Sequence, residues 1–547
     1  MVLPVKQIPN ENNGNTRESQ PSAGQPCVCL FSALYAPSTG GVEGYTRHLA
    51  HALARMGWRV IVVAMNTHGR EGYVHEADSD TQEQTDDAHQ PQASGAKGLQ
   101  QEGNREPQVK DSPKDIACDT PRPVAHDSIA ESPTDVQHAS GRTGAEPPTG
   151  TQHVSVRPTP RAARAAQPLV EVVRLPCKPL LGGRYPVPRK NAEFRALWRW
   201  LESQRINYVV VNTRFYLLSQ MGMELAQSKG IQPVVIEHGS AHLTMGSPLL
   251  DGAVQAVEHS LTRKVASYPA SFYGVSQRAC AWLHHFGITA SGVLPNAIDA
   301  DEFATLARTC PRNFRQELGL PGNAVVLAFV GRLVPEKGIA SLVEAVQRLK
   351  TDRPVALLVA GDGPLAQQLA QHSLSPLAAD ASNAEGAQGG MQEARQSKLQ
   401  GETKAHGACT AKLGGVLPLD SSPGSSRIVL LGAMERRQVA ALLAQADLLC
   451  LPSRSEGFAT VLLEAAAVGT PALATPVGGT DELIPSPEFG IVIPDNRPET
   501  IAKALEKALS QPEALAVVGR NAAKRVREHF TWRATASVLA GAGQGDA

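Results

Sequence analysis

Residues 324–338 read AVVLAFVGRLVPEKG and already indicate the class of fold. The first seven residues are all apolar, which is typical of a strand buried on both faces of a parallel sheet. A turn containing Gly331 and Gly338 follows, and residues 339–349 then have the apolar spacing of a helix. A strand, a short turn and a helix in this order predict a βαβ unit.

Strands and helices alternate on both sides of this unit. The expected strands are residues 27–34, 59–65, 169–175, 208–212, 234–237, 271–275, 355–360, 428–431, 448–451 and 471–474. The expected helices between them are residues 45–56, 191–204, 221–227, 435–446 and 461–468. Two such series in tandem predict an α/β protein of two Rossmann-like, doubly wound parallel-sheet domains, which face each other across a cleft at the carboxyl ends of their strands.

Two long polar segments interrupt this pattern, at residues 68–167 and 372–426. They hold too little apolar surface to offset the entropy of ordering, so we expect disordered insertions. The remaining expected parts are a disordered tail at 1–26, an N-terminal domain at 27–67 and 168–310, a C-terminal domain at 311–371 and 427–515, and a final helix and tail at 516–547 that packs back on the N-terminal domain.

The composition argues against some classes of function. Lysine plus arginine and aspartate plus glutamate both number 52, so the formal net charge is zero and no global attraction to nucleic acid is expected. The eight cysteines are scattered, which indicates neither a disulfide framework nor a metal site. Because the sequence shows no signal-peptide core and no apolar run of the roughly 20 residues that span a bilayer, we expect a protein of the reducing cytoplasm.

Two carboxylates mark the most informative stretch, PSRSEGFATVLLEAAAVGTP at residues 452–471. Thr460 is a plausible N-cap, which places Glu456 on the loop before a helix and Glu464 in or just after its first turn. The free amides of a helix start favour a diphosphate, and carboxylates accept hydrogen bonds from sugar hydroxyls. An acid at this place can equally complement the helix dipole.

Other candidate residues follow strands elsewhere in the sequence. Arg332 and Lys337 lie near the carboxyl edge of the sheet, where they could neutralise a diphosphate leaving group; the alternative is a pair of solvated loop cations. Gly40 and Gly41 lead into the first helix and suit a phosphate contact, although the turn lacks the dinucleotide-binding fingerprint. His238 also follows a strand and is placed to face the cleft, as a structural or a catalytic residue.

Together these stretches resemble family 4 of the retaining glycosyltransferases, which have the GT-B architecture. The spacing of Glu456 and Glu464 is similar to that family's Glu-x7-Glu signature, and Gly331-Arg332 to Lys337-Gly338 is similar to its diphosphate-binding turn. Further landmarks stand in the expected order: Gly274-Val275-Ser276, Pro295-Asn296-Ala297-Ile298-Asp299, Gly361-Asp362-Gly363-Pro364 and Gly478-Gly479-Thr480-Asp481-Glu482. Ala297 and Ala459 depart from the family pattern, because each replaces a glycine.

The resemblance implies a role for each candidate residue. Arg332 and Lys337 would bind the donor diphosphate. Glu456 would hold hydroxyls of the donor sugar and Glu464 the nucleotide ribose. The implied binding set is Gly40, Gly41, Arg332, Lys337, Glu456, Gly457, Phe458 and Glu464, and the implied catalytic set is Glu456, His238, Arg332 and Lys337.

The resemblance also implies a reaction. A sugar would pass from a nucleotide-diphosphate sugar, a UDP- or GDP-sugar, to a hydroxyl of a glycan or lipid-linked cell-envelope intermediate, with retention of anomeric configuration. The acceptor would attack from the front face as the diphosphate leaves, so positioning and charge stabilisation would supply most of the rate. No cofactor and no metal are expected, and the Asp-x-Asp at residues 78–80 falls in the first insertion.

Two other functions stay open from the sequence: a sugar-nucleotide 2-epimerase on the same scaffold, and a non-catalytic nucleotide-binding scaffold. Residues 189–205 combine arginines with Trp198, Trp200 and Leu201. This pattern predicts either a helix with its aromatic side on the core or a peripheral contact with an anionic bilayer. We therefore expect a cytoplasmic protein, with peripheral association at the inner face of the cell membrane as an alternative.

Overall fold

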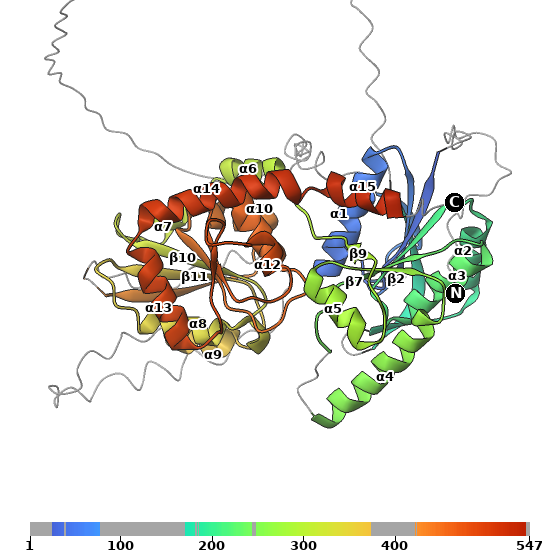
Figure 1. Ribbon diagram of the computed structural model, residues 1–547, viewed down its shortest axis with the longest axis horizontal. Coiled ribbons are helices and arrows are strands. Elements are labelled where there is room, and N and C mark those ends of the chain that lie inside the picture. Colours follow the sequence, from blue (N-terminus) through green and yellow to red (C-terminus); the bar gives the residue numbers. More distant parts are fainter. Residues whose placement is uncertain are drawn as a thin grey trace, which may run out of the picture. The chain divides into compact units, whose positions relative to one another are not determined.

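The computed structural model describes residues 25–37, 40–76, 170–180, 183, 185–242, 248–373, 422 and 424–542. Most of the two segments expected to be disordered insertions lies outside these residues, as does the tail before residue 25. The described residues form two α/β domains, each built on its own sheet (Figure 1).

The N-terminal sheet has the strand order β3-β4-β2-β1-β6-β7-β8-β9, and β5 pairs with β4. Strands β3 and β5 run antiparallel to β4, whereas the other pairs are parallel. Because β1 has β2 on one side and β6 on the other, its carboxyl end lies at the switch point where open α/β sheets bind ligands. The strands are β1 (Cys27–Phe31), β2 (Arg59–Asn66), β3 (Tyr73–Glu76), β4 (Val170–Leu180), β5 (Tyr185–Pro188), β6 (Tyr208–Asn212), β7 (Val234–Glu237), β8 (Ser271–Gly274) and β9 (Gly292–Val293).

Helices cover both faces of this sheet, because side chains alternate along each strand. Val28 and Leu30 of β1 join one apolar cluster, whereas Cys29 and Phe31 join another on the opposite face. The helices along this part of the chain are α1 (Gly41–Arg55), α2 (Ala192–Ser203), α3 (Leu217–Ser228), α4 (Pro248–Ala266), α5 (Gln277–His285) and α6 (Ala300–Thr309). Helix α6 lies within residues 168–310 of the expected N-terminal domain, and it packs on α10 and α11 of the C-terminal domain.

The C-terminal sheet is parallel throughout, in the order β12-β11-β10-β13-β14-β15. All residues of β11 are buried, as are the first five of β10, which is why their sequences are continuously apolar. The strands are β10 (Val325–Val330), β11 (Val355–Ala360), β12 (Ser426–Gly432), β13 (Leu448–Leu451), β14 (Ala472–Ala474) and β15 (Ile491–Val492). The predicted architecture of two parallel-sheet α/β domains is therefore confirmed, with two antiparallel strands added to the N-terminal sheet.

The helices of this second part include a short 3-10 turn, η4, that directly follows β10. They are α7 (Phe314–Glu317), η4 (Pro335–Lys337), α8 (Ile339–Gln347), α9 (Ala366–Ser373), α10 (Arg436–Gln445), α11 (Thr460–Ala467), α12 (Thr480–Leu483), α13 (Pro498–Leu509), α14 (Pro512–His529) and α15 (Trp532–Ala542). Helix α15 lies beside α1 (Figure 1), where the Trp532 ring packs 5.3 Å from the rings of Tyr45 and His48.

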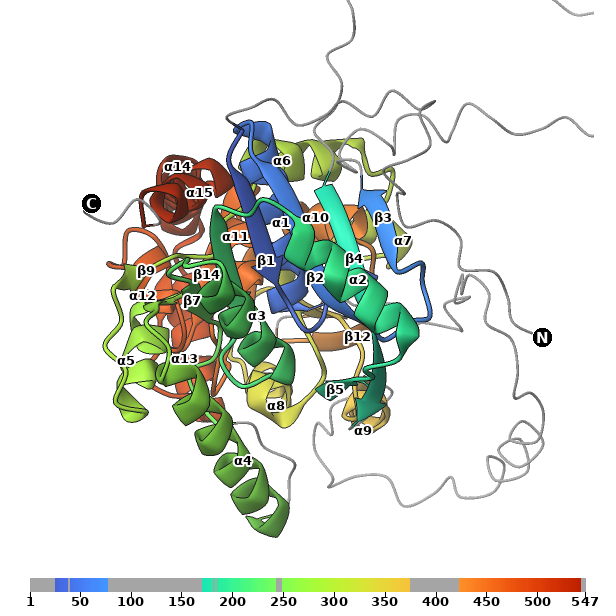
Figure 2. The ribbon, with the colours of Figure 1, turned by 90° about the vertical axis from the view of Figure 1, so that its right-hand side faces the viewer.

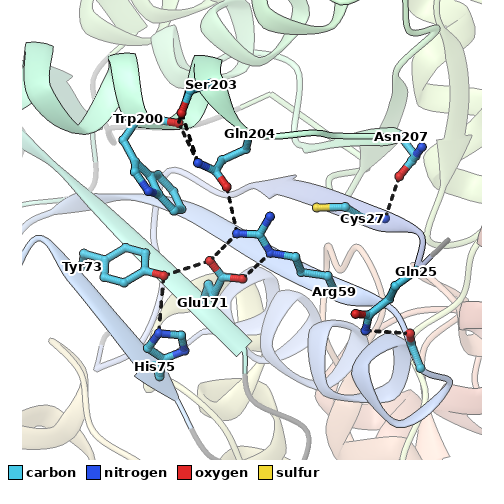
Figure 3. A network of polar contacts seen from close by, with 11 residues as sticks. Gln25, Cys27, Arg59, Tyr73, His75, Glu171, Trp200, Ser203, Gln204 and Asn207 are labelled. Atoms are coloured by element: carbon cyan, nitrogen blue, oxygen red, sulfur yellow. Dashed lines mark hydrogen bonds and ion pairs between the residues drawn. The ribbon is translucent and has the colours of Figure 1, made fainter. Parts of the chain in front are cut away.

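Strand β3 corrects the expected start of the first insertion, because Tyr73–Glu76 lie within residues 68–167 and yet pair with β4. A partly buried polar network explains why (Figure 3). Glu171 of β4 accepts hydrogen bonds from Arg59 Nε at 2.6 Å and from the Tyr73 hydroxyl at 2.9 Å. Gln204 accepts a further bond from Arg59 at 2.9 Å. Tyr73 thus completes a charge-assisted network that the polar sequence around it does not reveal.

Helix α2 carries the tryptophans of the basic, aromatic stretch, and Figure 2 shows the helix beside β4. Trp198 packs edge-on against Phe31 of β1, and Trp200 packs edge-on against Tyr73. Both rings therefore rest on the apolar cluster of the N-terminal sheet. Across the part of the chain that the structure describes, no helix combines the length and apolar character needed to span a membrane.

Candidate functional site

Strands β10 and β13 are neighbours at the switch point of the C-terminal sheet, and the turns that follow them meet. Gly338 has a φ of 70° and lies so close to β13 that a Cβ there would stand 2.0 Å from the Pro452 carbonyl oxygen. The Arg454 amide also donates to the Glu336 carbonyl at 2.7 Å. Only glycine fits at position 338, and this contact brings Lys337 against the loop before α11.

Lys337 and Glu456 form an ion pair at this junction. Lys337 Nζ lies 2.6 Å from Glu456 Oε1, and the Ser453 hydroxyl donates to the same oxygen at 2.7 Å. The side chains are 25% and 9% exposed, so the pair is largely shielded but open to a ligand on the lysine side. An ammonium group has three donors, and the bond to Glu456 leaves two of them for other oxygens. Ser453 is a functional candidate that the sequence analysis missed.

Glu464 is the fifth residue of α11, and its surroundings differ from those of Glu456. Burial raises the pKa of its carboxyl group, while the charge of Arg436 acts in the opposite direction. Within the described ranges, no hydrogen bond or ion pair involves this side chain. The helix begins at Thr460 and its N-cap is Ala459, so the expected capping by Thr460 is wrong by one residue. The Glu464 side chain is half-buried.

His238 follows β7 and is held in one orientation by its neighbours. Its Nε2 lies 2.9 Å from Asn212 Oδ1, and its ring stands 4.7 Å from the ring of Tyr45 in an edge-on contact. Burial lowers the pKa of the imidazole to about 3, so His238 is neutral at physiological pH. A neutral imidazole can exchange hydrogen bonds with a sugar or a phosphate but adds no positive charge.

The lowered pKa of His238 predicts a pH dependence of stability. An unfolded histidine titrates near 6.5, so between that pH and about 3 the unfolded chain binds a proton that the folded chain does not. The free energy of unfolding should therefore fall as the pH drops below about 6.5, by up to about 1.4 kcal/mol per pH unit from this residue. Urea unfolding between pH 7.5 and 5.5 measures this slope, which His238→Asn should reduce and the exposed-site control His284→Asn should not. Equal slopes for wild type and His238→Asn would contradict the prediction.

Gly457 and Phe458 are held by the N-terminal domain through their backbones. A Cβ at Gly457 would lie 1.7 Å from the His238 carbonyl oxygen, so this close approach requires glycine. Ser276 Oγ donates to the Gly457 carbonyl at 3.0 Å, and Asn296 Nδ2 donates to the Phe458 carbonyl at 3.3 Å. The Phe458 ring itself is buried, which leaves only its backbone to face a ligand.

A further hydrogen bond between the domains runs from the Ser240 hydroxyl to the carbonyl of Glu456. Ser276 and Asn296 belong to motifs that the sequence analysis named, whereas nothing in the sequence marked Ser240. The loop carrying Glu456 is therefore fixed by residues of both domains, although its sequence lies in only one of them.

Gly40 and Gly41 open α1 at the carboxyl end of β1, and both are exposed. The Glu43 side chain folds over this turn, because a Cβ at Gly40 would lie 2.5 Å from Glu43 Oε2. Burial raises the pKa of the Glu43 carboxyl group, which the sequence analysis did not consider. An anion approaching these glycines would meet Glu43 first unless that side chain turns away or is protonated.

The structure brings some candidates together and leaves others apart. Lys337, Glu456, Gly457 and His238 form one contiguous set through the contacts above. Arg332 is exposed, and across the described residues no hydrogen bond or ion pair links its side chain, or those of Glu464 and His238, to the Lys337–Glu456 pair. A single ligand that contacts every candidate residue would have to reach from the Lys337–Glu456 pair to Arg332, Glu464 and the His238 side chain.

Comparison with known proteins adds to this geometry. Residues 312–386 and 423–525 match the family model of the glycosyl transferases group 1. The D-inositol 3-phosphate glycosyltransferase of Jonesia denitrificans is 25% identical over 341 residues, which are 62% of this chain and 66% of that protein. The sucrose-phosphate synthase of Thermosynechococcus elongatus superposes with a TM-score of 0.54 at 17% identity, over 95% of this chain and 98% of its own.

Another solved structure, that of the Anabaena protein HepE in complex with UDP-glucose, superposes with a TM-score of 0.52 at 15% identity, over 94% of this chain and 98% of its own. Likeness at this level of identity establishes the fold, which is of the GT-B type. The sequence match spans about two thirds (66%) of the length of the Jonesia relative. The family match lies in the C-terminal domain and supports the group 1 glycosyl transferase family for this chain.

Proposed function

We propose that this protein is a glycosyltransferase that moves a sugar from a nucleotide-diphosphate sugar to a hydroxyl acceptor. The observation that carries the proposal is the Lys337–Glu456 pair, which stands where two parallel strands end and an α-helix begins. Such a place offers a cation for a diphosphate, a carboxylate for sugar hydroxyls and free helix amides within one site. The group 1 family match to the same domain supports this reading.

The donor roles follow from the charges of the site. Lys337 keeps two donors free and would bind the diphosphate as a point charge, while the exposed Arg332 guanidinium would add a bidentate contact. Glu456 would hold the donor sugar, and the half-buried carboxyl of Glu464 would accept hydrogen bonds from the ribose. Those bonds would offset the desolvation that raises the pKa of the Glu464 carboxyl group. Gly40, Gly41 and the backbone of Gly457 and Phe458 would complete the donor site.

We assign a UDP-sugar as the first donor to test, and a GDP-sugar as the second, because the similarly folded HepE is described in complex with UDP-glucose. Transfer would retain the anomeric configuration and proceed without a metal at this site, with Lys337 and Arg332 stabilising the charge on the leaving diphosphate. The neutral His238 would orient a hydroxyl near the reacting carbon. In this mechanism Glu456 positions the sugar and does not attack it.

For the acceptor we propose a glycan or a lipid-linked intermediate of envelope polysaccharide synthesis, handled in the cytoplasm. Peripheral contact with the inner face of the membrane stays a prediction. Because Trp198 and Trp200 pack on the core, the exposed basic residues of this stretch, inside α2 and beside it, would have to make the contact. Co-sedimentation with anionic liposomes would measure that contact, and an absence of binding would remove it from the proposal.

Thermal shift with sugar nucleotides tests the central claim. UDP-, GDP- and ADP-sugars are added to wild type, to Lys337→Ala and to the control Lys350→Ala, which removes an exposed lysine outside the site. One class of donor should raise the melting temperature of wild type and of the control, because a ligand that binds only the folded state stabilises it. Lys337→Ala should lose most of that shift.

Two results would overturn the proposal. One is a wild-type protein that no sugar nucleotide stabilises. The other is a stabilising donor that is released as an epimerised sugar nucleotide when no acceptor is present.

A further inference from the structure

Three histidines meet on the N-terminal domain at a place that the proposed transfer reaction does not use. His242 follows β7, His259 lies in α4 and His285 ends α5. One ring nitrogen of each lies within 4.8 Å of the others, and this is the only such group of histidine, cysteine or acidic side chains within the described part of the chain. Helices α4 and α5 lie next to each other in Figures 1 and 2, and the rings of His259 and His285, 26 positions apart in the sequence, lie 5.5 Å apart.

Two of these imidazoles are fixed in one tautomer by a hydrogen bond at Nδ1. His259 Nδ1 lies 2.8 Å from the Gln255 carbonyl oxygen, which can only accept, so Nδ1 carries the proton and Nε2 has a free lone pair. His242 Nδ1 lies 2.8 Å from Glu258 Oε2 and is fixed in the same way. Histidines that bind metals usually donate their second ring N–H to a carbonyl or a carboxylate in this manner.

The charges below the cluster also favour a cation. Glu258 and Glu237 are both buried, and both pair with the same buried cation, Arg214. These three groups carry a net charge of −1 when ionised, and Glu258 lies directly behind His242. A divalent ion held by neutral imidazoles would place positive charge beside this excess negative charge.

From these observations we propose that His242, His259 and His285 bind a zinc ion. Tetrahedral zinc at its usual distance to nitrogen needs ligand nitrogens about 3.3 Å apart, so the side chains must close from their present separations of up to 4.8 Å. His285 is exposed at the end of its helix, where its ring stacks on Trp282 with the centroids 4.8 Å apart, so closing the site requires this ring to shift along the stack. Three histidine ligands leave a fourth position for water.

The zinc ion would tie the loop after β7 to α4 and α5. That loop contains Ser240, which donates to the Glu456 carbonyl, and Glu237 at its start accepts a hydrogen bond from the Gly239 amide at 2.7 Å. The site is separate from the Lys337–Glu456 pair, so it does not alter the metal-free transfer proposed above. The experiment that tests the zinc site measures metal binding and does not depend on any transferase activity.

The experiment uses the full chain, freed of metal by dialysis against a chelator. Zinc is then titrated in competition with a chromophoric chelator, and cobalt is added separately as a spectroscopic probe. Wild type should bind one zinc ion per chain and give the strong visible absorption of four-coordinate cobalt. His285→Ala and His259→Ala should weaken zinc binding by about 100-fold or more, because the loss of even an outer-shell partner costs up to that much.

His284→Ala is the matched control, because it removes a neighbouring exposed histidine of the same helix that is not part of the cluster. It should bind zinc like wild type. Zinc should also raise the melting temperature of wild type and of His284→Ala but not of His285→Ala, which reports binding even if His259→Ala folds poorly. A wild-type chain that binds no stoichiometric zinc, or a His285→Ala chain that binds it as tightly as wild type, would overturn the proposal and leave the cluster as aromatic packing around Trp282.

Discussion

Glu456→Gln should fold normally and lose sugar transfer by about 100-fold in kcat, the loss that a displacement of the reacting group by about 1 Å can cause. The amide has the shape of the carboxylate but not its charge. It therefore loses the ion pair with Lys337 Nζ at 2.6 Å and weakens any bond to a hydroxyl of the donor sugar. Initial rates with saturating donor and acceptor measure the effect.

The same substitution should change stability little. Lys337 is a quarter exposed, so water can solvate its ammonium group once the partner charge is gone, and about 1 kcal/mol or less is expected. Glu336→Gln is the matched control, because Glu336 is an exposed acid one position from Lys337 that contributes its carbonyl oxygen to the Arg454 contact. The control should keep wild-type turnover. Near-normal turnover in Glu456→Gln would remove Glu456 from the mechanism, whatever the control shows.

The sequence predicted the sheets well because burial leaves a direct mark on composition. Strands such as β10 and β11 are covered on both faces, so they must be apolar along their whole length. The same sequence gave no sign of α4, whose polar and apolar residues are mixed. Strand β3 was hidden for a related reason: its stability depends on Tyr73 reaching Glu171, about a hundred positions away in the sequence, across an insertion.

The candidate site was predictable only in part. Local spacing placed Lys337 on the turn after β10 and Glu456 on the loop before α11, and the structure shows that these two side chains meet. Local spacing could not show that the His238 carbonyl lies close against Gly457, because that contact joins residues more than two hundred positions apart. Arg214 was overlooked as well, since a charged residue just after a strand is usually solvated, and only the fold reveals that this one is fully buried.

Arg214→Met should produce the largest loss of stability. The Arg214 guanidinium is fully buried and pairs with Glu237 and, at 2.6 Å, with Glu258, whose side chains are 1% and 3% exposed. It also stacks 4.0 Å from the centre of the Phe286 ring. Methionine fills much of the same space but leaves two buried carboxylates without their cation. Breaking a buried ion pair from one side costs about 3–5 kcal/mol, because the remaining charge is neither solvated nor paired.

The comparison that isolates this effect is Arg278→Met. Arg278 also forms an ion pair, with Asp481 at 2.9 Å, but the two side chains are 45% and 53% exposed. Water replaces the lost partner there, so about 0–1 kcal/mol is expected. Urea unfolding at pH 7.5 measures both variants, and Arg214→Met should also melt roughly 6–20 °C below wild type. If the two variants lose the same stability, Arg214 is not the cation that holds Glu237 and Glu258 in the core.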